Sequence, residues 1–194
     1  MKEKPYHHGN LRNDLIEAGI QLINEEGLKS FSLRKVAARC QVSHTAPYSH
    51  FKDVDALISA MGEYVTGQFM HKLHSAVHGK DEHPGQLAFL GKAYIDFFVE
   101  HPHYFQFLYY HSGLTIDLDR AQPEDYPPFA LFRTTAFRMF HKWGLPEEQH
   151  FTKLIVAWSL VHGITALSAT NGIKYSGSWT DIFMRTLTKE EREE

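Results

Sequence analysis

The chain has 194 residues, of which 43% are hydrophobic and 22% charged, and its formal net charge at pH 7 is −3. These values are typical of a soluble globular protein with a real core, and they exclude a disordered or collagen-like chain. A single cysteine excludes an intramolecular disulfide, and residues 1–8 contain no apolar signal segment, so we expect a cytoplasmic protein.

Apolar residues recur at three- and four-residue spacing along most of the chain, which predicts helices and no strand. A first amphipathic helix runs from about Asn10, its N-cap, to Glu26, and Gly27 stops it. Ser32 then caps a short helix, a turn follows at 41–43, and a third, shorter helix ends near Phe51. Further helices are expected at about 53–78, 86–101, 103–111, 127–143, 147–171 and 178–189, with a loop at 112–128. The fold class is therefore all-α.

One segment, residues 154–173, contains no Asp, Glu, Lys or Arg and is long enough to raise the question of a membrane span. Ser159, His162 and Asn171 interrupt it, and hydrocarbon tolerates such groups poorly. We therefore interpret the segment as a buried or interface helix and expect no membrane association.

Charge is distributed unevenly along the chain. Residues 27–52 contain no acidic side chain and five basic ones, Lys29, Arg34, Lys35, Arg39 and Lys52. In residues 81–125, by contrast, most of the charged side chains are acidic. A basic segment on a mildly acidic body is typical of a small DNA-binding module that is joined to a second function.

The basic segment also has the pattern of a helix-turn-helix, because two short helices flank a turn of three or four residues. Ala37 is small where the two helices cross, and Val42 is apolar where the turn meets the core. Ser43 or Thr45 can cap the second helix. Pro47 is tolerated only in the first turn of a helix, so this helix must begin within a residue or two of Pro47. The single cysteine, Cys40, falls at a position where we expect the core of the helix-turn-helix.

Residues 6–70 resemble the tetracycline-repressor-like (TetR) family of bacterial regulators. The matching elements are the opening Tyr6 to Arg12, then S-L-R-x-V-A, V-S-x-x-x-x-Y-x-H-F and D-A-L in order. Far downstream, Trp158-x-x-x-His162-Gly163 resembles the Trp-His-Gly signature of the C-terminal domain in one branch of that family.

The resemblance implies a homodimer with an N-terminal DNA-binding domain, here 8–68, and a C-terminal regulatory and dimerisation domain, here 69–194. The family's recognition helix falls on 44–50. The residues expected to touch DNA are Arg34, Ser43, His44, Thr45, Tyr48, Ser49, His50 and Lys52. Two positions depart from the family pattern, because Gln41 replaces the usual turn glycine and Val54 a usual lysine, for which Lys52 is the substitute.

The remainder of the chain is rich in aromatic residues. We expect some of them to line an apolar effector pocket between helices, with Tyr94, Phe98, Tyr109, Trp158 and His162 as candidates. On the charge-free helix, Ser159, Gly163 and Ala166 form a stripe of small residues that favours close approach of a second protomer.

The sequence therefore predicts a dimeric DNA-binding regulator, most simply a repressor. Its partners would be a pseudo-palindromic double-stranded operator and a small-molecule effector of unknown identity, with no cofactor. No phosphate-binding loop, nucleophile elbow or enzyme-type metal motif occurs, so we expect no enzyme. The alternative is a helical sensor or adaptor for a small molecule or zinc, without specific DNA binding. Its zinc version would use the His71, His74 and His78 face, although our prediction is that no metal binds there.

Overall fold

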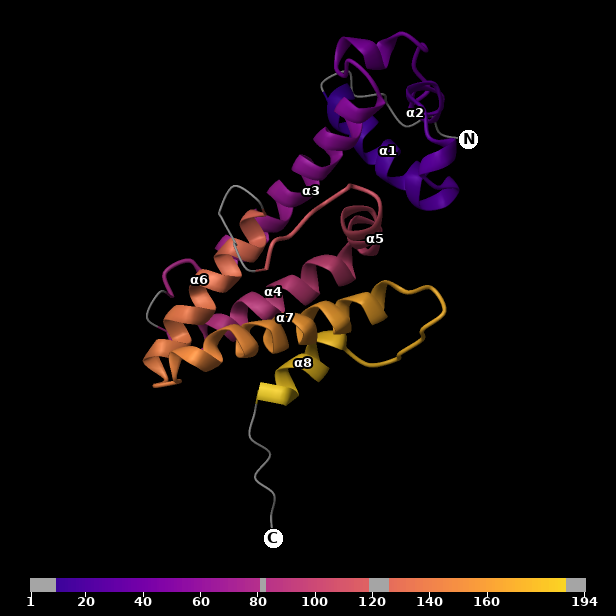
Figure 1. The fold of residues 1–194 in the computed structure, drawn as a ribbon. Helices are drawn as coiled ribbons and strands as arrows, with labels where there is room; N and C mark the ends of the chain where they lie inside the picture. The colour runs from indigo at the N-terminus through magenta and orange to yellow at the C-terminus, as the bar shows by residue number, and fades with distance from the viewer. Residues whose placement is uncertain (1–9, 81–82, 119–125, 188–194) are drawn as a thin grey trace. The chain divides into compact units, whose positions relative to one another are not determined.

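The computed structural model describes residues 10–80, 83–118 and 126–187, and over these ranges it contains helices and no strand (Figure 1). The all-α prediction is therefore confirmed. The α-helices are α1 (Leu11–Glu26), α2 (Leu33–Arg39), α3 (Val54–Val77), α4 (Gln86–Glu100), α5 (Pro102–Tyr110), α6 (Pro127–Lys142), α7 (Glu147–Ala169) and α8 (Trp179–Leu187). Two short 3₁₀ helices, η1 (Leu28–Ser30) and η2 (Ala46–Ser49), lie between α1 and α3.

The helix ends follow the local signals in the sequence. Gly27 ends α1 with φ 79°, and the hydroxyl of Ser32 accepts a hydrogen bond from the backbone N–H of Lys35 at the start of α2. Asn10 is the N-cap of α1 but makes no side-chain cap bond.

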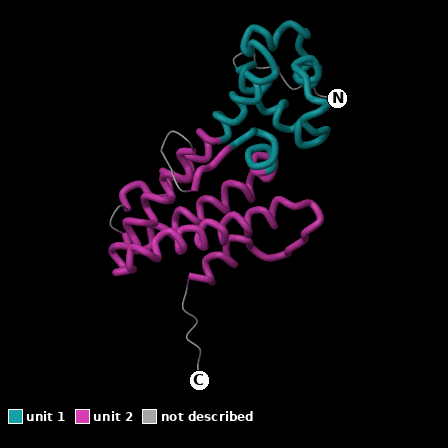
Figure 2. Tube along the Cα trace, in the orientation of Figure 1, with its two compact units in different colours: residues 1–65, 106–114 teal, residues 66–105, 115–194 magenta. Residues whose placement is uncertain are grey.

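The described chain divides into two compact units, residues 1–65 with 106–114, and residues 66–105 with 115–194 (Figure 2). The division falls inside α3 and inside α5. The predicted domain limits, 8–68 and 69–194, stay a prediction.

In the first unit, α1 packs against α2, and α2 packs against η2. Its core consists of fully or almost fully buried aliphatic side chains, including Ile16 and Ile20 of α1, Val36 of α2 and Leu57 and Met61 of α3. Burying these side chains also stabilises α2, which at 7 residues would be marginal as an isolated helix.

In the second unit, α4 is the central helix and packs against α6, α7 and α8. Its core is aromatic, with Phe69, Phe98, Phe105 and Phe129 each at most 1% exposed. The ring of Phe69 packs against Phe97, Phe98 and Tyr94 with centroids 4.8–5.2 Å apart.

Among the described residues, one helix, α7, is long and apolar enough to cross a membrane by length and composition, with mean hydropathy 1.3. That criterion alone is weak, because the core helix of a soluble protein meets it as well.

Candidate functional site

The predicted helix-turn-helix is formed by α2, the turn at 40–45 and η2. Ala37 is fully buried, and its carbonyl oxygen accepts a hydrogen bond of 3.0 Å from the N–H of Val42, which closes the turn. Gln41 has φ 57°, so the non-glycine residue does occupy a left-handed conformation, which costs about 1 kcal/mol.

The second helix of the motif is shorter than predicted. Residues 46–49 form a single 3₁₀ turn in place of a helix over 44–50, and Pro47 is the second residue of that turn, within the predicted limit. The prediction that Ser43 or Thr45 caps it is wrong: their hydroxyls lie 3.1 Å apart and hydrogen-bond to each other. Neither hydroxyl satisfies the N–H groups of η2.

All the predicted DNA-contacting side chains lie at the surface of the first unit. Tyr48 is 60% exposed although it is large and aromatic, and the Lys52 side chain is 89% exposed. Packing in the core does not explain an exposed tyrosine on a short turn, and the exposure is consistent with a role in contacting DNA. The other exposed members of the set are Arg34, Ser43, His44, Thr45, Ser49 and His50.

The basic segment carries less free charge than its sequence indicates. Arg39 donates two hydrogen bonds of 2.6 and 2.7 Å to the carboxylate of Glu25, and Lys35 lies 2.7 Å from Glu26. The hydrogen bonds from Arg39 hold the pKa of the Glu25 carboxyl below its ordinary value. Both acidic partners lie at the end of α1, just before the basic segment 27–52, so the composition of that segment alone does not show the pairing.

Other contacts hold α3 and the residue after η2 in place, and the sequence did not predict them. The Arg12 guanidinium lies 5.5 Å from the centroid of the Phe51 ring, directly after η2. The hydroxyl of Tyr64 donates a hydrogen bond of 2.8 Å to Glu17. The Asp53 carboxylate accepts a hydrogen bond of 2.8 Å from the Ala56 N–H and so caps α3.

Most of the predicted effector-pocket residues meet inside the second unit. The Tyr94 hydroxyl and Nδ1 of His162 are 3.0 Å apart and hydrogen-bonded, and the Trp158 ring lies edge-on to Tyr94 at 5.4 Å. Burial lowers the pKa of His162 below its ordinary value of 6.5. Phe98 is fully buried nearby, whereas Tyr109 is half-buried and belongs to the first unit.

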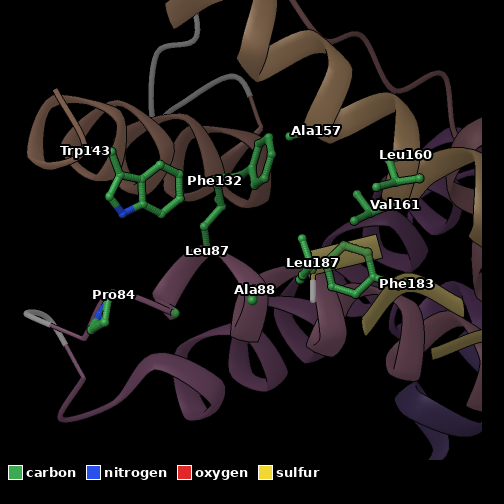
Figure 3. A pocket seen from close by; sticks show the side chains of 12 residues that line it. Pro84, Leu87, Ala88, Phe132, Trp143, Ala157, Leu160, Val161, Phe183 and Leu187 are labelled. Atoms are coloured by element: carbon green, nitrogen blue, oxygen red, sulfur yellow. The ribbon is translucent and has the colours of Figure 1, made fainter. Parts of the chain in front are cut away.

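This aromatic cluster leaves little room for a ligand. The void that Tyr94 and Trp158 line holds about 10 Å³. A separate cavity of about 300 Å³ lies between α4, α6, α7 and α8, and none of the five predicted residues lines it (Figure 3). Residue spacing does not predict this cavity, because the residues that line it are spread over positions 84 to 187.

The small-residue stripe of α7 faces away from the core of its own unit. Ser159 is exposed, and a Cβ added at Gly163 would meet nothing within 4 Å. Two apolar side chains on the same helix, Val156 and Leu167, are 61% and 45% exposed. Ala166 is half-buried. The helix therefore presents an uncovered apolar surface.

The histidine face of α3 does not form a metal site in the described part of the chain. His71, His74 and His78 are exposed, and no group of three or more His, Cys, Asp or Glu there is placed to hold an ion.

Cys40 is half-buried, its Sγ lies 3.5 Å from the Asp14 carbonyl oxygen, and burial raises the pKa of its thiol.

Two family models match the chain. Residues 15–61 match the model described as bacterial regulatory proteins of the tetR family, and residues 87–189 match a tetracyclin repressor-like C-terminal domain. The class G tetracycline repressor of Vibrio anguillarum is 40% identical over 52 residues, which are 27% of this chain and 25% of that protein. A class A repressor from transposon 1721 of Escherichia coli is 33% identical over 70 residues, 36% of this chain and 32% of that protein. The matches thus span about a third or less of these curated relatives.

Solved structures of other proteins are similar to this fold over nearly the whole chain. A protein of unknown function from Rhodococcus sp. RHA1 is 25% identical with a TM-score of 0.71, and the match covers 95% of both chains. The fatty acid degradation regulator FadR of Bacillus halodurans, at 13% identity, has a TM-score of 0.67 over 95% of this chain and 94% of its own. At that identity the likeness shows the fold alone. The Trp-His-Gly branch stays a prediction.

Proposed function

The chain belongs to the TetR family of DNA-binding transcriptional regulators, and we propose that it is a homodimeric repressor which a small-molecule effector releases from a pseudo-palindromic operator. The family and the fold are those of a regulator and not of an enzyme. Its place of action would be the cytoplasm, where the operator is.

The observation that carries the proposal is the exposed face of the helix-turn-helix. Tyr48, Ser49 and His50 lie at the surface of a turn short enough to enter a major groove, and Arg34 is exposed on α2. We expect these side chains to determine sequence specificity, and Lys29, Arg34 and Lys52 to supply most of the salt-dependent attraction to phosphates. Lys52 is itself paired, because its Nζ lies 3.6 Å from the Asp53 carboxylate, but 89% of its side chain is exposed. Lys35 and Arg39 would contribute less while Glu26 and Glu25 hold them.

Dimerisation is supported by the uncovered face of α7. Val156 and Leu167 would otherwise remain exposed to water, and Ser159 and Gly163 leave space for the backbone of a second copy. A two-fold dimer of this kind would present two helix-turn-helix motifs to successive major grooves.

Effector control follows from linkage between the two sites. An effector that binds more tightly to a form with mis-spaced motifs must lower operator affinity. The helices α3 and α5 each belong to both units, and the longer one, α3, is a covalent element through which the second unit would act on the first.

The experiment is fluorescence anisotropy of the purified protein on DNA from immediately upstream of its own gene, across a salt series and against scrambled competitor. Tyr48→Ala should abolish specific binding and leave the dimer folded, because it removes an exposed side chain. Tyr110→Ala is the matched control, since Tyr110 is 65% exposed outside the motif. Full operator affinity in Tyr48→Ala would remove the assignment of the recognition turn. If only weak, sequence-blind binding were found there, fragments selected genome-wide would decide whether a specific site exists.

A further inference from the structure

The cavity of the second unit is large enough for a small molecule. Its volume of about 300 Å³ is at the lower end of the range for ligand pockets, and it is partly open to solvent. Small residues on two helices, Ala88 of α4 and Ala157 of α7, leave the space open. Three aromatic rings line it, those of Phe132 in α6, Trp143 at the C-terminal end of α6 and Phe183 in α8 (Figure 3).

The chemistry of the walls restricts the ligand. Among the described residues that line the cavity, none carries a charged side chain, and the indole N–H of Trp143 is the only polar side-chain group. A carboxylate or ammonium placed there would lose its hydration without gaining a partner, at a cost of several kcal/mol. Flat aromatic walls favour a ring system.

We propose that this cavity is the effector site and that the effector is an uncharged, largely aromatic molecule. The proposal rests on the effector-controlled function argued above and names the class of compound that it requires. The aromatic cluster of Tyr94 and Trp158 offers only about 10 Å³ and serves as the wall behind the site. Val161 and Phe132 line both spaces, so they join the cluster to the cavity.

Other hollows of the second unit suit such a molecule less well. Two shallow grooves run between α3 and α4, and both are lined by ionised side chains. Lys72 lies 3.2 Å from Glu100, and Lys92 pairs with Asp96 one helical turn away. An apolar ligand there would have to cover these ion pairs and remove them from water.

The position of the cavity would also allow ligand binding to affect the proposed dimer interface. Leu160 and Val161 of α7 line the cavity, and the uncovered face proposed for dimerisation lies on the same helix. A ligand that moves α7 or α8 would therefore change the surface through which two protomers meet, and with it the spacing of the two DNA-binding motifs.

The test uses two fluorescent probes with one skeleton. N-phenyl-1-naphthylamine is neutral, and 8-anilinonaphthalene-1-sulfonate adds a single negative charge. We expect the neutral probe to bind once per protomer of the full-length protein, and the sulfonate to bind at least about 10-fold more weakly.

Two substitutions fill the cavity from opposite walls, Ala157→Trp on α7 and Ala88→Phe on α4. Each should weaken binding of the neutral probe by about 10-fold or more, whereas Thr134→Trp, on the exposed surface of α6, should not. Helical content by circular dichroism shows which variants fold, and either folded variant suffices.

Absent binding of the neutral probe would overturn the proposal, as would equal binding by wild type and a folded filled variant. Sulfonate binding at least as tight as that of the neutral probe, and lost in the filled variants, would overturn the assignment of an uncharged ligand. Operator binding, measured on the same preparations without probe, reports separately on the proposed function.

Discussion

Gly91→Ala tests how α8 is held against α4. A Cβ at Gly91 would lie 2.9 Å from Cε1 of Phe183 and closer still to Cζ, so the phenyl ring would have to leave its place. Phe183 is 4% exposed and is the buried anchor of the described part of α8. We therefore expect the substitution to undock α8.

The size of the effect follows from two opposing terms. Expelling a buried phenylalanine side chain loses about 1.5–3 kcal/mol. Replacing glycine by alanine inside a helix gains about 1 kcal/mol. The free energy of unfolding should therefore fall by about 0.5–2 kcal/mol.

The matched control is Gly67→Ala in α3, where an added Cβ meets nothing within 4 Å. That variant should be more stable by about 1 kcal/mol, so the same substitution should have opposite signs at the two sites. Urea unfolding followed by circular dichroism, at one protomer concentration, measures both. In a Phe183→Ala background, Gly91→Ala should become stabilising, because the clash is absent. An equal gain at Gly91 and Gly67 in the wild-type background would refute the reasoning.

Three further predictions concern other parts of the chain. Gln41→Gly should raise the free energy of unfolding by about 0.5–1 kcal/mol in urea melts, because φ 57° is unstrained for glycine; a loss would show that the Gln41 side chain stabilises the turn. Gly163→Glu should give monomers in sedimentation velocity, since like charges would face each other across the proposed interface; an unchanged dimer would place the interface elsewhere. His162 resists protonation when folded, whereas the unfolded chain binds the proton as pH falls through 6.5, so acid should lower stability. His162→Gln should flatten that loss in urea melts between pH 7.5 and 5, values chosen around the ordinary histidine pKa of about 6.5; an unchanged slope would assign the loss to other groups.

Local backbone chemistry determined much of the first unit. The end of α1 at Gly27 and the cap at Ser32 each depend on residues within one helical turn, and the sequence contains them all. The left-handed turn at Gln41 followed only from the resemblance to the family, because glutamine does not favour that conformation. The same holds for the long helices, whose apolar periodicity predicted their ends to within about two residues.

Local chemistry predicted the interactions less well where a side chain has more than one available partner. Ser43 and Thr45 are both good caps, and in the structure their hydroxyls satisfy each other. The basic segment looked uncompensated because Glu25 precedes Arg39 by 14 residues, and only the packing of α1 against α2 brings the two together.

The sequence by itself therefore determined the family, the helical fold and the exposed helix-turn-helix face, since these depend on residue types at short, regular spacing. Tertiary structure alone decided which charges are paired and where an empty space remains. A cavity is the volume that four packed helices fail to fill, and it depends on small residues such as Ala88 and Ala157 that are far apart in the chain. No spacing rule along the sequence reports that volume, because it belongs to the packing of α4, α6, α7 and α8 and not to any one helix.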